Sequence, residues 1–374
     1  MDEDKLRDLR AEIATLDREI FELATRRNEI VEAIAQLKTA AQLPQRDFAQ
    51  EKSVVERARQ YCVELGLDFA VYEPVILTLI RASNTIEERK RLSTQNNGNN
   101  QTVLVIGGAG KMGGWMISYL HAQGFTPVSA DPGGEVEGVE SHSDWRPLDL
   151  DAYDAIVVAP PLRFTNDVLL ELAERRPRGV IFDVGSLKSP LRTGIQALQA
   201  AGLRVSSIHP MFGPDVELLS GRHVIFIDCG HAEALAWTHQ LFSNTTAVRV
   251  DMTLDEHDEL IAYVLGLSHA TNIAFFTALA ESGQAAPRLA RMSSSTFDAQ
   301  LSVAAKVAEE NPWLYYDIQA LNDFGMDALN SLKRAVENIY DAVQSKDTDR
   351  FVNIMLQGRD YLHAREVSED VLKR

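Results

Sequence analysis

The segment Thr102-Val-Leu-Val-Ile-Gly-Gly-Ala-Gly-Lys-Met-Gly113 decides the fold of the central part of the chain. Its four apolar, mostly β-branched residues, 103–106, predict a fully buried strand. A glycine loop follows, and residues 115–120 predict a helix. Strand, glycine loop and helix in this order are typical of a unit that binds a dinucleotide.

Three glycines of this loop, Gly108, Gly110 and Gly113, have the G-x-G-x-x-G spacing. In this motif the first glycine permits a tight turn, the second lets the backbone approach a pyrophosphate, and the third lets the helix pack on the strand. A second predicted strand, 126–130, ends at Asp131, about 20 residues past the glycines, where an acid binds the ribose 2′-hydroxyl. Because Pro-Gly-Gly follows, with no Lys or Arg for a 2′-phosphate, we predict NAD rather than NADP as the cofactor.

The bulk composition restricts the class of protein. At 374 residues, with 45% hydrophobic and 24% charged residues, the chain suggests two or three soluble globular domains. A net charge of −17 argues against nucleic acid and anionic membranes as partners, but not against small anionic substrates. Cys62 and Cys229 form no metal or redox motif, and no apolar run approaches the roughly 20 residues that span a bilayer. We therefore expect a cytoplasmic protein without a metal.

The N-terminal part predicts a long amphipathic helix, because apolar residues recur every three or four positions from Leu6 to Leu37. Arg27 occupies a position that this stripe skips, as either a register-setting residue of a dimer or a ligand for an anionic substrate. Lys38 lies on the same face about three turns further on. Arg10 lies roughly 26 Å before Arg27 along the axis, so it would serve a different pocket, as in an intertwined dimer.

Two further helices follow this first one. Asp47 is placed to cap the second helix, which carries Gln50 and Glu51. Ser83 and Glu87, four residues apart, share a face of the third helix.

These residues together resemble the all-helical chorismate mutases, which are intertwined dimers of three-helix chains. The resemblance covers about residues 1–90 and rests on Arg10, Arg27, Lys38, Asp47, Glu51, Ser83 and Glu87. It implies that the two arginines, one from each chain, hold the substrate carboxylates. It also implies that Lys38 hydrogen-bonds the ether oxygen of the breaking C–O bond and that Glu51 binds the ring hydroxyl.

Two positions of this helical segment differ from many relatives. Glu87 stands where many carry Gln, and a carboxyl group donates to the ether oxygen only when it is protonated. We therefore expect mutase activity to fall as Glu87 ionises. Gln50 stands where the family usually has an arginine that binds a substrate carboxylate.

Beyond a polar tether, residues 93–101, strands alternate with helices, which predicts a doubly wound parallel sheet. The further strands are expected at 153–158, 179–183, 203–208 and 223–228. Ligands bind at the carboxyl ends of such strands. Ser186 and His209 both lie just past a predicted strand end, as does the glycine loop.

The second part of the chain, about residues 101–370, resembles the prephenate dehydrogenases. The motifs occur in the family's order: Gly108-x-Gly110-x-x-Gly113, Asp183-Val-Gly-Ser-Leu-Lys188, His209-Pro-Met-Phe-Gly213 and Glu256-His-Asp258. The resemblance implies that neutral His209 accepts the proton of the C4 substituent while a hydride leaves for NAD. It further implies that Ser186 orients that group and that His257 faces the substrate pocket. The C-terminal helices would form the dimer interface.

A further departure is Asp298, which follows Phe297 where relatives carry an arginine that pairs with a substrate carboxylate. Arg288 and Arg291 are near enough in sequence to replace it. Gln50 and Asp298 each remove a cation, which would suit substrates with an extra ammonium group. The alternative function is therefore the 4-amino-4-deoxychorismate mutase and 4-amino-4-deoxyprephenate dehydrogenase pair, giving 4-aminophenylpyruvate.

Our main prediction is a bifunctional homodimeric enzyme of tyrosine biosynthesis that converts chorismate to prephenate and then, with NAD, to 4-hydroxyphenylpyruvate. The expected division is a helical mutase domain at 1–92, a linker at 93–101, a Rossmann NAD-binding domain at 102–250 and a helical substrate and dimerisation domain at 251–374. A helical segment that only dimerises or senses an effector is the alternative for the first domain. Another Rossmann dehydrogenase is the alternative for the rest.

Overall fold

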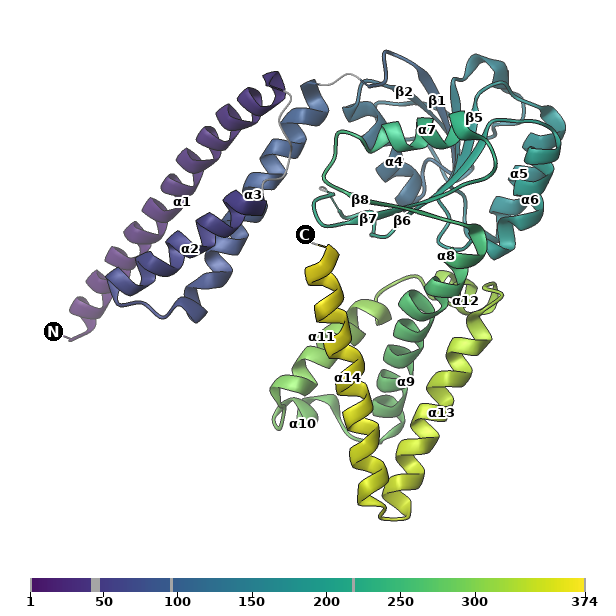
Figure 1. Ribbon diagram of the computed structural model, residues 1–374. Coiled ribbons are helices and arrows are strands. Elements are labelled where there is room, and N and C mark those ends of the chain that lie inside the picture. The colour runs from purple at the N-terminus through teal and green to yellow at the C-terminus, as the bar shows by residue number, and fades with distance from the viewer. Residues whose placement is uncertain (1, 42–47, 95–96, 217–218, 373–374) are drawn as a thin grey trace. The chain divides into compact units, whose positions relative to one another are not determined.

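A computed structural model describes residues 2–41, 48–94, 97–216 and 219–372 (Figure 1). The chain forms two compact units: Met1–Ser186 with Leu191–Thr253, and Leu187–Pro190 with Leu254–Arg374. The first unit contains three N-terminal helices and a β-sheet with its flanking helices, and the second is helical. The predicted cap residue Asp47 lies outside the described residues.

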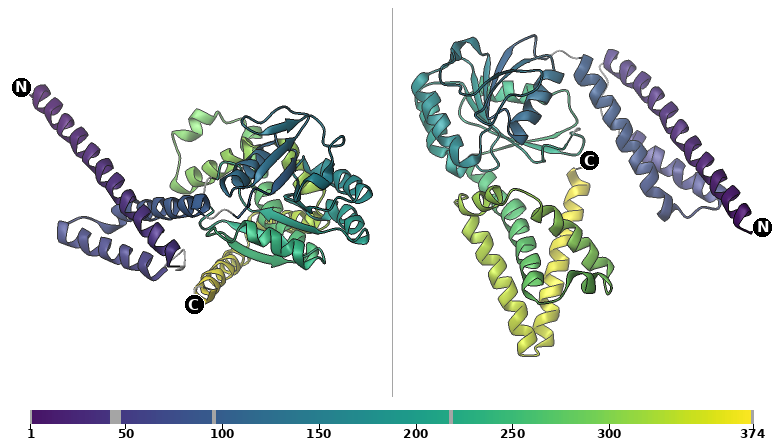
Figure 2. Two further views of the ribbon diagram at one scale, coloured as in Figure 1. Left: turned by 90° about the horizontal axis from the view of Figure 1, so that it is seen from above. Right: turned by 180° about the vertical axis from the view of Figure 1, so that it is seen from behind.

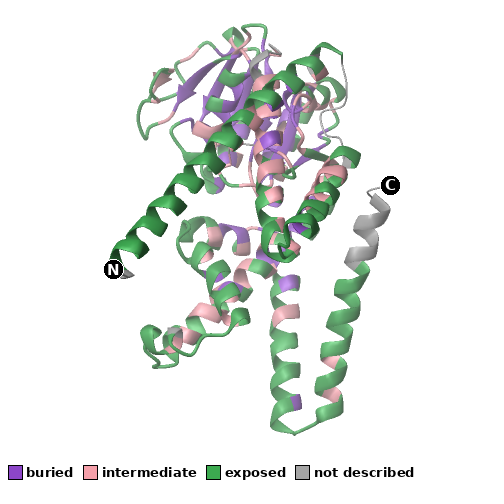
Figure 3. Ribbon diagram, turned by 90° about the vertical axis from the view of Figure 1, so that its left-hand side faces the viewer, coloured by how far each residue is buried: buried purple, intermediate pink, exposed green. Residues whose placement is uncertain are grey.

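The N-terminal helices are α1 (Asp2–Ala40), α2 (Phe48–Leu65) and α3 (Phe69–Thr94). Both α1 and α2 pack against α3. The 39 residues of α1 span about 58 Å at 1.5 Å per residue. The three predicted helices are thus confirmed. The apolar stripe of α1 is exposed along its length, with Ile13 58% and Ile20 60% exposed (Figure 3), and an exposed apolar surface of this extent marks a site of association.

In the described part of the chain, the sheet contains eight strands in the order β3-β2-β1-β4-β5-β6-β7-β8. Their bounds are β1 (Thr102–Ile106), β2 (Thr126–Ala130), β3 (Glu140–His142), β4 (Ala155–Val158), β5 (Val180–Asp183), β6 (Val205–Pro210), β7 (His223–Ile227) and β8 (Val248–Met252). The first six strands of the chain are parallel and have the order of a Rossmann fold. The predicted doubly wound architecture is confirmed.

The last two strands depart from the parallel direction. β7 pairs with β6 in antiparallel register, His209 opposite Ile225, and β8 then runs parallel to β7, so the sheet is mixed. The physical reason is the connection 211–222, whose described residues contain no helix. A parallel return to the neighbouring strand needs a long crossover, whereas an antiparallel return does not.

The sheet is covered by the helices α4 (Lys111–Ala122), α5 (Leu162–Arg175), α6 (Arg192–Ala200) and α7 (Ala232–Leu241). α5 and α6 pack side by side on one face, and α4 and α7 lie on the other (Figures 1 and 2). Short 3-10 turns occur at η1 (Leu150–Ala152) and η2 (Ser189–Leu191). The central strands are buried on both faces, since Val103, Leu104 and Val105 are 0% exposed, which is why their sequence is continuously apolar.

The second unit begins with α8 (Leu254–Ile261), the π-helical turn η3 (Ala262–Leu267) and α9 (Ser268–Glu281). It continues with α10 (Ala286–Ala290), α11 (Ser295–Ala308), α12 (Pro312–Ala320), α13 (Gly325–Gln344) and α14 (Thr348–Leu372). Among the described residues, the stretch Leu254–Glu281 is the one helix that is long and apolar enough to cross a membrane. Length and composition alone do not distinguish a membrane-spanning helix from a helix that packs inside a protein. Polar residues such as His269 interrupt this stretch, and a search for unbroken apolar runs therefore misses it.

Candidate active site

The first candidate site lies among the three N-terminal helices, where Arg27 reaches from α1 to α3. Its guanidinium donates to the Leu79 carbonyl oxygen at 2.8 Å and to Ser83 Oγ at 2.5 Å. Ser83 in turn donates to the same carbonyl at 2.9 Å. Burial lowers the pKa of Arg27 from its usual value. The predicted pair of Arg27 and Ser83 is therefore held together as a preformed cationic group between α1 and α3.

Lys38 and Glu87 form the second pair of this site. Lys38 Nζ lies 2.9 Å from Glu87 Oε2, and both side chains are only about a quarter exposed or less, at 24% and 20%. The next turn of α3 carries Arg91, which the sequence analysis did not select. Burial lowers the pKa of Arg91, and the nearby charge of Glu87 opposes that shift. The site thus contains a cation in addition to the predicted ones.

The remaining predicted mutase residues lie on α1 and α2. Glu51 Oε1 accepts a hydrogen bond from Asn84 Nδ2 at 3.1 Å, which joins α2 to α3. Asn84 follows Ser83 directly, and this adjacency to a predicted residue was its one signal in the sequence. Gln50 and Arg10 are exposed. The geometry thus brings together Arg27 with Ser83, Lys38 with Glu87, and Glu51 with Asn84.

The second candidate site begins at the glycine loop of the sheet. Gly107 has φ +87, which favours glycine, and donates to the Ala130 carbonyl at 2.9 Å. A Cβ added at Gly113 would lie 2.0 Å from the Gly107 carbonyl oxygen. The loop and α4 therefore approach each other as closely as glycine permits. No side chain of these glycines covers the backbone where a pyrophosphate would bind. These residues fit NAD.

Asp131 stands at the end of β2 and faces this loop. Its Oδ2 accepts from the Ala109 N–H at 3.2 Å, and its Oδ1 accepts from the Gly133 N–H at 2.6 Å. A hollow of about 490 Å³ adjoins Asp131 and is lined by residues of 131–135, 141–144 and 147–148, all of them described. The lining includes Glu135 and Asp144 but no Lys or Arg. A 2′-phosphate would meet only acidic charge here, whereas a ribose hydroxyl finds an acceptor.

Ser186 and His209 lie at the carboxyl ends of neighbouring strands of the sheet. His209 is the penultimate residue of β6, not the residue after it, and is 5% exposed. Ser186 comes three residues after β5 and is half-buried. The turn before it is shaped by Asp183, whose Oδ1 accepts from the Gly185 N–H at 2.9 Å. β5 and β6 are hydrogen-bonded neighbours, so both residues belong to the edge of the sheet at which ligands bind.

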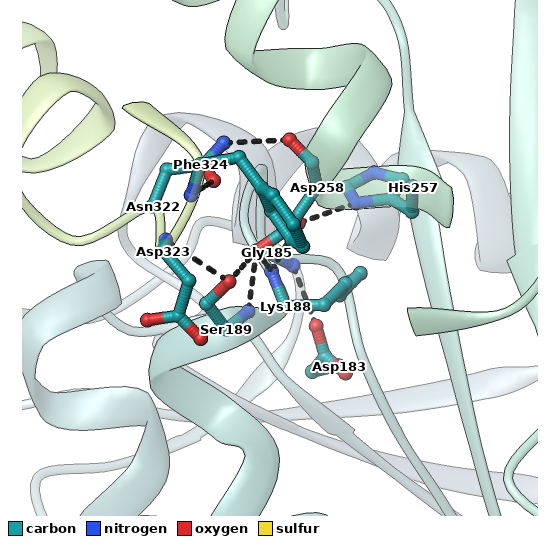
Figure 4. Close-up of polar contacts among 9 residues, drawn as sticks. All are labelled: Asp183, Gly185, Lys188, Ser189, His257, Asp258, Asn322, Asp323 and Phe324. Atoms are coloured by element: carbon teal, nitrogen blue, oxygen red, sulfur yellow. Dashed lines mark hydrogen bonds and ion pairs between the residues drawn. The ribbon is translucent and has the colours of Figure 1, made fainter. Parts of the chain in front are cut away.

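In the helical unit, His257 lies on α8 with its side chain 0% exposed. Its Nδ1 lies 2.6 Å from Asp258 Oδ1 (Figure 4). The Asp258 carboxylate also accepts from the main-chain N–H groups of Lys188 and Ser189. Burial alone raises the pKa of Asp258, but these hydrogen bonds outweigh it and hold the pKa below its usual range. The prediction placed His257 at a pocket surface; the structure places it in a buried polar cluster, and its role stays a prediction.

A second histidine of this unit, the half-buried His269, was not predicted from the sequence. Its ring lies 4.1 Å from the Tyr315 ring, centroid to centroid, and its buried Nδ1 has no hydrogen-bond partner among the described residues. Burial lowers the pKa of His269, which keeps the imidazole neutral near pH 7. Its one signal in the sequence was its place three residues after Gly266 in a helical stretch. In the structure it lies two residues past the π-helical turn η3, a feature frequent at functional sites.

Asp298 lies in the first turn of α11 and is exposed. Its Oδ1 accepts a hydrogen bond from the Ser293 hydroxyl, and an acid in the first turn is favoured by the helix dipole. Arg288 and Arg291 are also exposed. Asp298 thus has a local structural reason to be acidic. Among the described residues, no group of three or more His, Cys, Asp or Glu side chains could hold a metal ion.

Three domain families match successive parts of the chain. Residues 9–88 match chorismate mutase type II, residues 138–250 match the nucleotide-binding domain of prephenate dehydrogenase, and residues 253–357 match its dimerization domain. The matched families therefore define a helical mutase fused to an NAD-binding dehydrogenase. The chain belongs to the family of bifunctional chorismate mutase–prephenate dehydrogenases.

Individual relatives match all or part of the chain. The T-protein of Haemophilus influenzae is 24% identical over 372 residues, covering 98% of this chain and 94% of its own. A 4-amino-4-deoxyprephenate dehydrogenase of Streptomyces pristinaespiralis is 28% identical over 269 residues, covering 69% of this chain and 90% of its own. The crystal structure of prephenate dehydrogenase from Aquifex aeolicus with hydroxyphenyl propionate and NAD+ superposes with a TM-score of 0.55 at 18% identity, covering 71% and 98%. At that identity it supports the fold.

Proposed function

We propose that the chain rearranges chorismate to prephenate and then oxidises prephenate, with loss of CO₂, to 4-hydroxyphenylpyruvate. The observation that carries the proposal is the pairing of two sites on one chain. Helices α1 and α3 hold two pairs, Arg27 with Ser83 and Lys38 with Glu87. The sheet carries a dinucleotide loop after β1 and, at the carboxyl ends of the neighbouring strands β5 and β6, Ser186 and His209. The product of the first reaction is the substrate of the second.

For the mutase, the chain needs only to orient the substrate and stabilise charge, because the reaction is unimolecular. Arg27 binds a substrate carboxylate, and Arg10 of a second copy binds the other. Lys38 donates to the ether oxygen as negative charge develops there, and Glu87, when protonated, is a second donor. Glu51 binds the ring hydroxyl, with Asn84 fixing its orientation at 3.1 Å. Gln50 and Ser83 adjoin the carboxylates.

For the dehydrogenase, bound NAD supplies the hydride acceptor. His209 accepts the proton of the C4 hydroxyl as the C4 hydride departs, and Ser186 orients that hydroxyl. The bond between the ring and its carboxylate then breaks, CO₂ leaves, and the electron pair of that bond completes the aromatic ring while the C4 oxygen takes the proton back from His209. Asp131 holds the ribose, and Gly108, Gly110 and Gly113 leave room for the pyrophosphate.

The assembly and location belong to the same proposal. A homodimer is supported by the exposed apolar stripe of α1 and by the match to a dimerization domain. A cytoplasmic location is supported by Cys62 and Cys229, which are buried and form no disulfide. The division at 1–92, 93–101, 102–250 and 251–374 remains our working definition of the domains.

The hydroxylated substrate series is better supported than the 4-amino series. The H. influenzae T-protein matches nearly the whole chain, whereas the 4-amino relative covers only 69% of it. Asp298, one of the two departures behind the alternative, is explained by its hydrogen bond from Ser293 and its place in a first helical turn. Gln50 is one exposed position on α2.

The test is to supply chorismate and NAD to the full-length protein and to follow products by mass and NADH by absorbance. We expect 4-hydroxyphenylpyruvate, and a rate at least tenfold lower with the 4-amino substrates. His209→Asn should accumulate prephenate while NADH formation falls by about 10²–10⁴-fold, the usual contribution of a general base. The matched control is His239→Asn, which alters a histidine of α7 that pairs with Asp251 of β8. Undiminished NADH formation by His209→Asn, or preference for the 4-amino series, would overturn the proposal.

A further inference from the structure

The Asp258 carboxylate has an unusually complete set of hydrogen-bond donors. It is 0% exposed and accepts from four groups: the Lys188 N–H at 2.9 and 3.1 Å, the Ser189 N–H at 2.5 Å, the Ser189 hydroxyl, and His257 Nδ1 at 2.6 Å (Figure 4). A carboxylate has about four lone-pair positions. Every one of them is used, so the group is ionised and fixed in a single orientation.

The donors come from separate parts of the chain. Lys188 and Ser189 follow Ser186 within three residues, whereas Asp258 lies on α8, some seventy positions further on. The loop between α12 and α13 joins them, because Asn322 Nδ2 donates to the Asp258 carbonyl at 2.9 Å and the Asp323 N–H donates to Ser189 Oγ at 3.3 Å. Asp258 thus fixes the main chain that begins two residues after Ser186.

The same carboxylate determines the form of the His257 ring. Because an ionised carboxylate only accepts, Nδ1 must carry the hydrogen that points to Asp258 Oδ1. The acid–base chemistry of the ring is thereby assigned to Nε2. A buried acid that orients a histidine through Nδ1 is a recurrent way to fix its tautomer in catalytic and metal sites.

We propose that Asp258 is a positioning residue of the dehydrogenase, which fixes the tautomer of His257 and anchors the main chain that follows Ser186. This inference rests on the proposed dehydrogenase function. It assigns the Asp258 carboxylate no contact with substrate. Its effect passes through His257 on one side and through residues 188–189 on the other.

The substitution Asp258→Asn separates the two effects. Both Ser189 donors bond Oδ2, so the oxygen of the new side-chain amide takes that position and the amide NH₂ faces His257 Nδ1. The Lys188 N–H keeps its 3.1 Å bond to this oxygen and loses the 2.9 Å bond to Oδ1. The imidazole then has to accept at Nδ1 and carry its hydrogen at Nε2, the opposite tautomer. Three of the four hydrogen bonds that anchor the main chain are retained while the tautomer of the histidine is switched.

The experiment measures both activities of full-length Asp258→Asn. We expect kcat for prephenate oxidation to fall at least tenfold, the KM for NAD to stay within twofold, and the mutase rate to stay within twofold. Asp251→Asn, which alters an exposed aspartate paired with His239, is the matched control and should leave both rates unchanged. In a His257→Asn background, adding Asp258→Asn should lower kcat by less than a further twofold, because the histidine that Asp258 orients is already absent.

A second pair of variants tests the anchor, even if Asp258→Asn fails to fold. Ser189→Ala removes one of the four donors and should lower kcat about three- to tenfold, and Ser189→Thr should restore it. The inference is overturned if the kcat of Asp258→Asn for prephenate oxidation is within twofold of the wild type, or if Ser189→Ala leaves this kcat unchanged. It is also overturned if the kcat of the double variant falls by the product of the two single losses, those of Asp258→Asn and His257→Asn. Absence of prephenate oxidation by the wild-type protein would instead refute the proposed function.

Discussion

The glycine loop allows a graded prediction in which the size of the effect follows from distances to a missing methyl group. An alanine Cβ would lie 2.0 Å from the Gly107 carbonyl oxygen at position 113, and 3.2 Å from it at position 110. At position 114 the nearest atom, the Gly108 carbonyl oxygen, is 3.6 Å away. The first contact is impossible, the second is tight and the third is ordinary. The neighbours are backbone atoms, so they cannot rotate away.

The expected loss for Gly113→Ala can be estimated. Relief of the clash requires the loop to move by about 1 Å or more relative to α4, since carbon atoms rest near 3.5 Å from their neighbours. Such a shift removes about two hydrogen bonds from backbone N–H groups to the charged pyrophosphate, each worth about 1.5–3 kcal/mol. The sum, about 3–6 kcal/mol, corresponds to roughly a 10²–10⁴-fold weaker affinity for NAD.

The assay is the Kd for NAD, measured by calorimetry on the full-length variants, with chorismate turnover of each preparation as the control for folding. We expect the order Gly113→Ala, Gly110→Ala, Gly114→Ala from the weakest to the strongest binding. Gly114→Ala should bind NAD within twofold of the wild type and gain about 0.5–1 kcal/mol of helix stability. Wild-type affinity in Gly113→Ala, or equal losses in Gly113→Ala and Gly114→Ala, would refute this account of the loop.

Two predictions concern the mutase. Glu87→Gln should flatten the fall of mutase activity with rising pH, because an amide donates to the ether oxygen at every pH whereas the carboxyl donates only when protonated. Initial mutase rates from pH 5 to 9 measure this. An unchanged pH profile removes Glu87 from the mechanism. Arg91→Gln should raise the KM for chorismate about tenfold with little change in kcat, because it removes a half-buried cation close to Glu87. The control is Arg89→Gln, which removes an exposed arginine. An equal rise of the KM in this control would show that only the overall charge matters.

The parts of the fold that the sequence predicts are those set by local patterns. The strand at 103–106 and the glycines after it are adjacent, and each constrains its neighbours directly, so β1, its loop and α4 follow from the order of residues. Strand direction is not local. Residues 223–227 are as apolar as the parallel strands, yet β7 runs antiparallel because the connection before it lacks a crossover helix in its described residues. β3 was missed because Glu-Ser-His carries no apolar signal.

The residues of the candidate sites also divide into those that a sequence pattern predicts and those that only packing determines. Resemblance selected Lys38 and Glu87 although they are far apart in sequence, and the structure brings them to 2.9 Å. Arg91 was not selected, because a charged helix end is usually a solvated surface. His209 was predicted just past a strand end, whereas the structure places it one residue inside the carboxyl end of β6. Single positions were predictable where a family motif includes them, and unpredictable where only packing determines their surroundings.

Asp258 shows why packing matters for function as well as for fold. Adjacent residues on a helix normally point in different directions, so the dipeptide His257-Asp258 does not by itself predict the 2.6 Å contact between the two side chains. That contact exists because burial forces the carboxylate to find donors, and those donors lie in the loop after β5 and on the helix itself, braced by the turn after α12. A buried charge that lacked any one of them would be costly. The requirement that all its donors be present at once makes the position of the main chain at 188–189 and the state of His257 depend on each other.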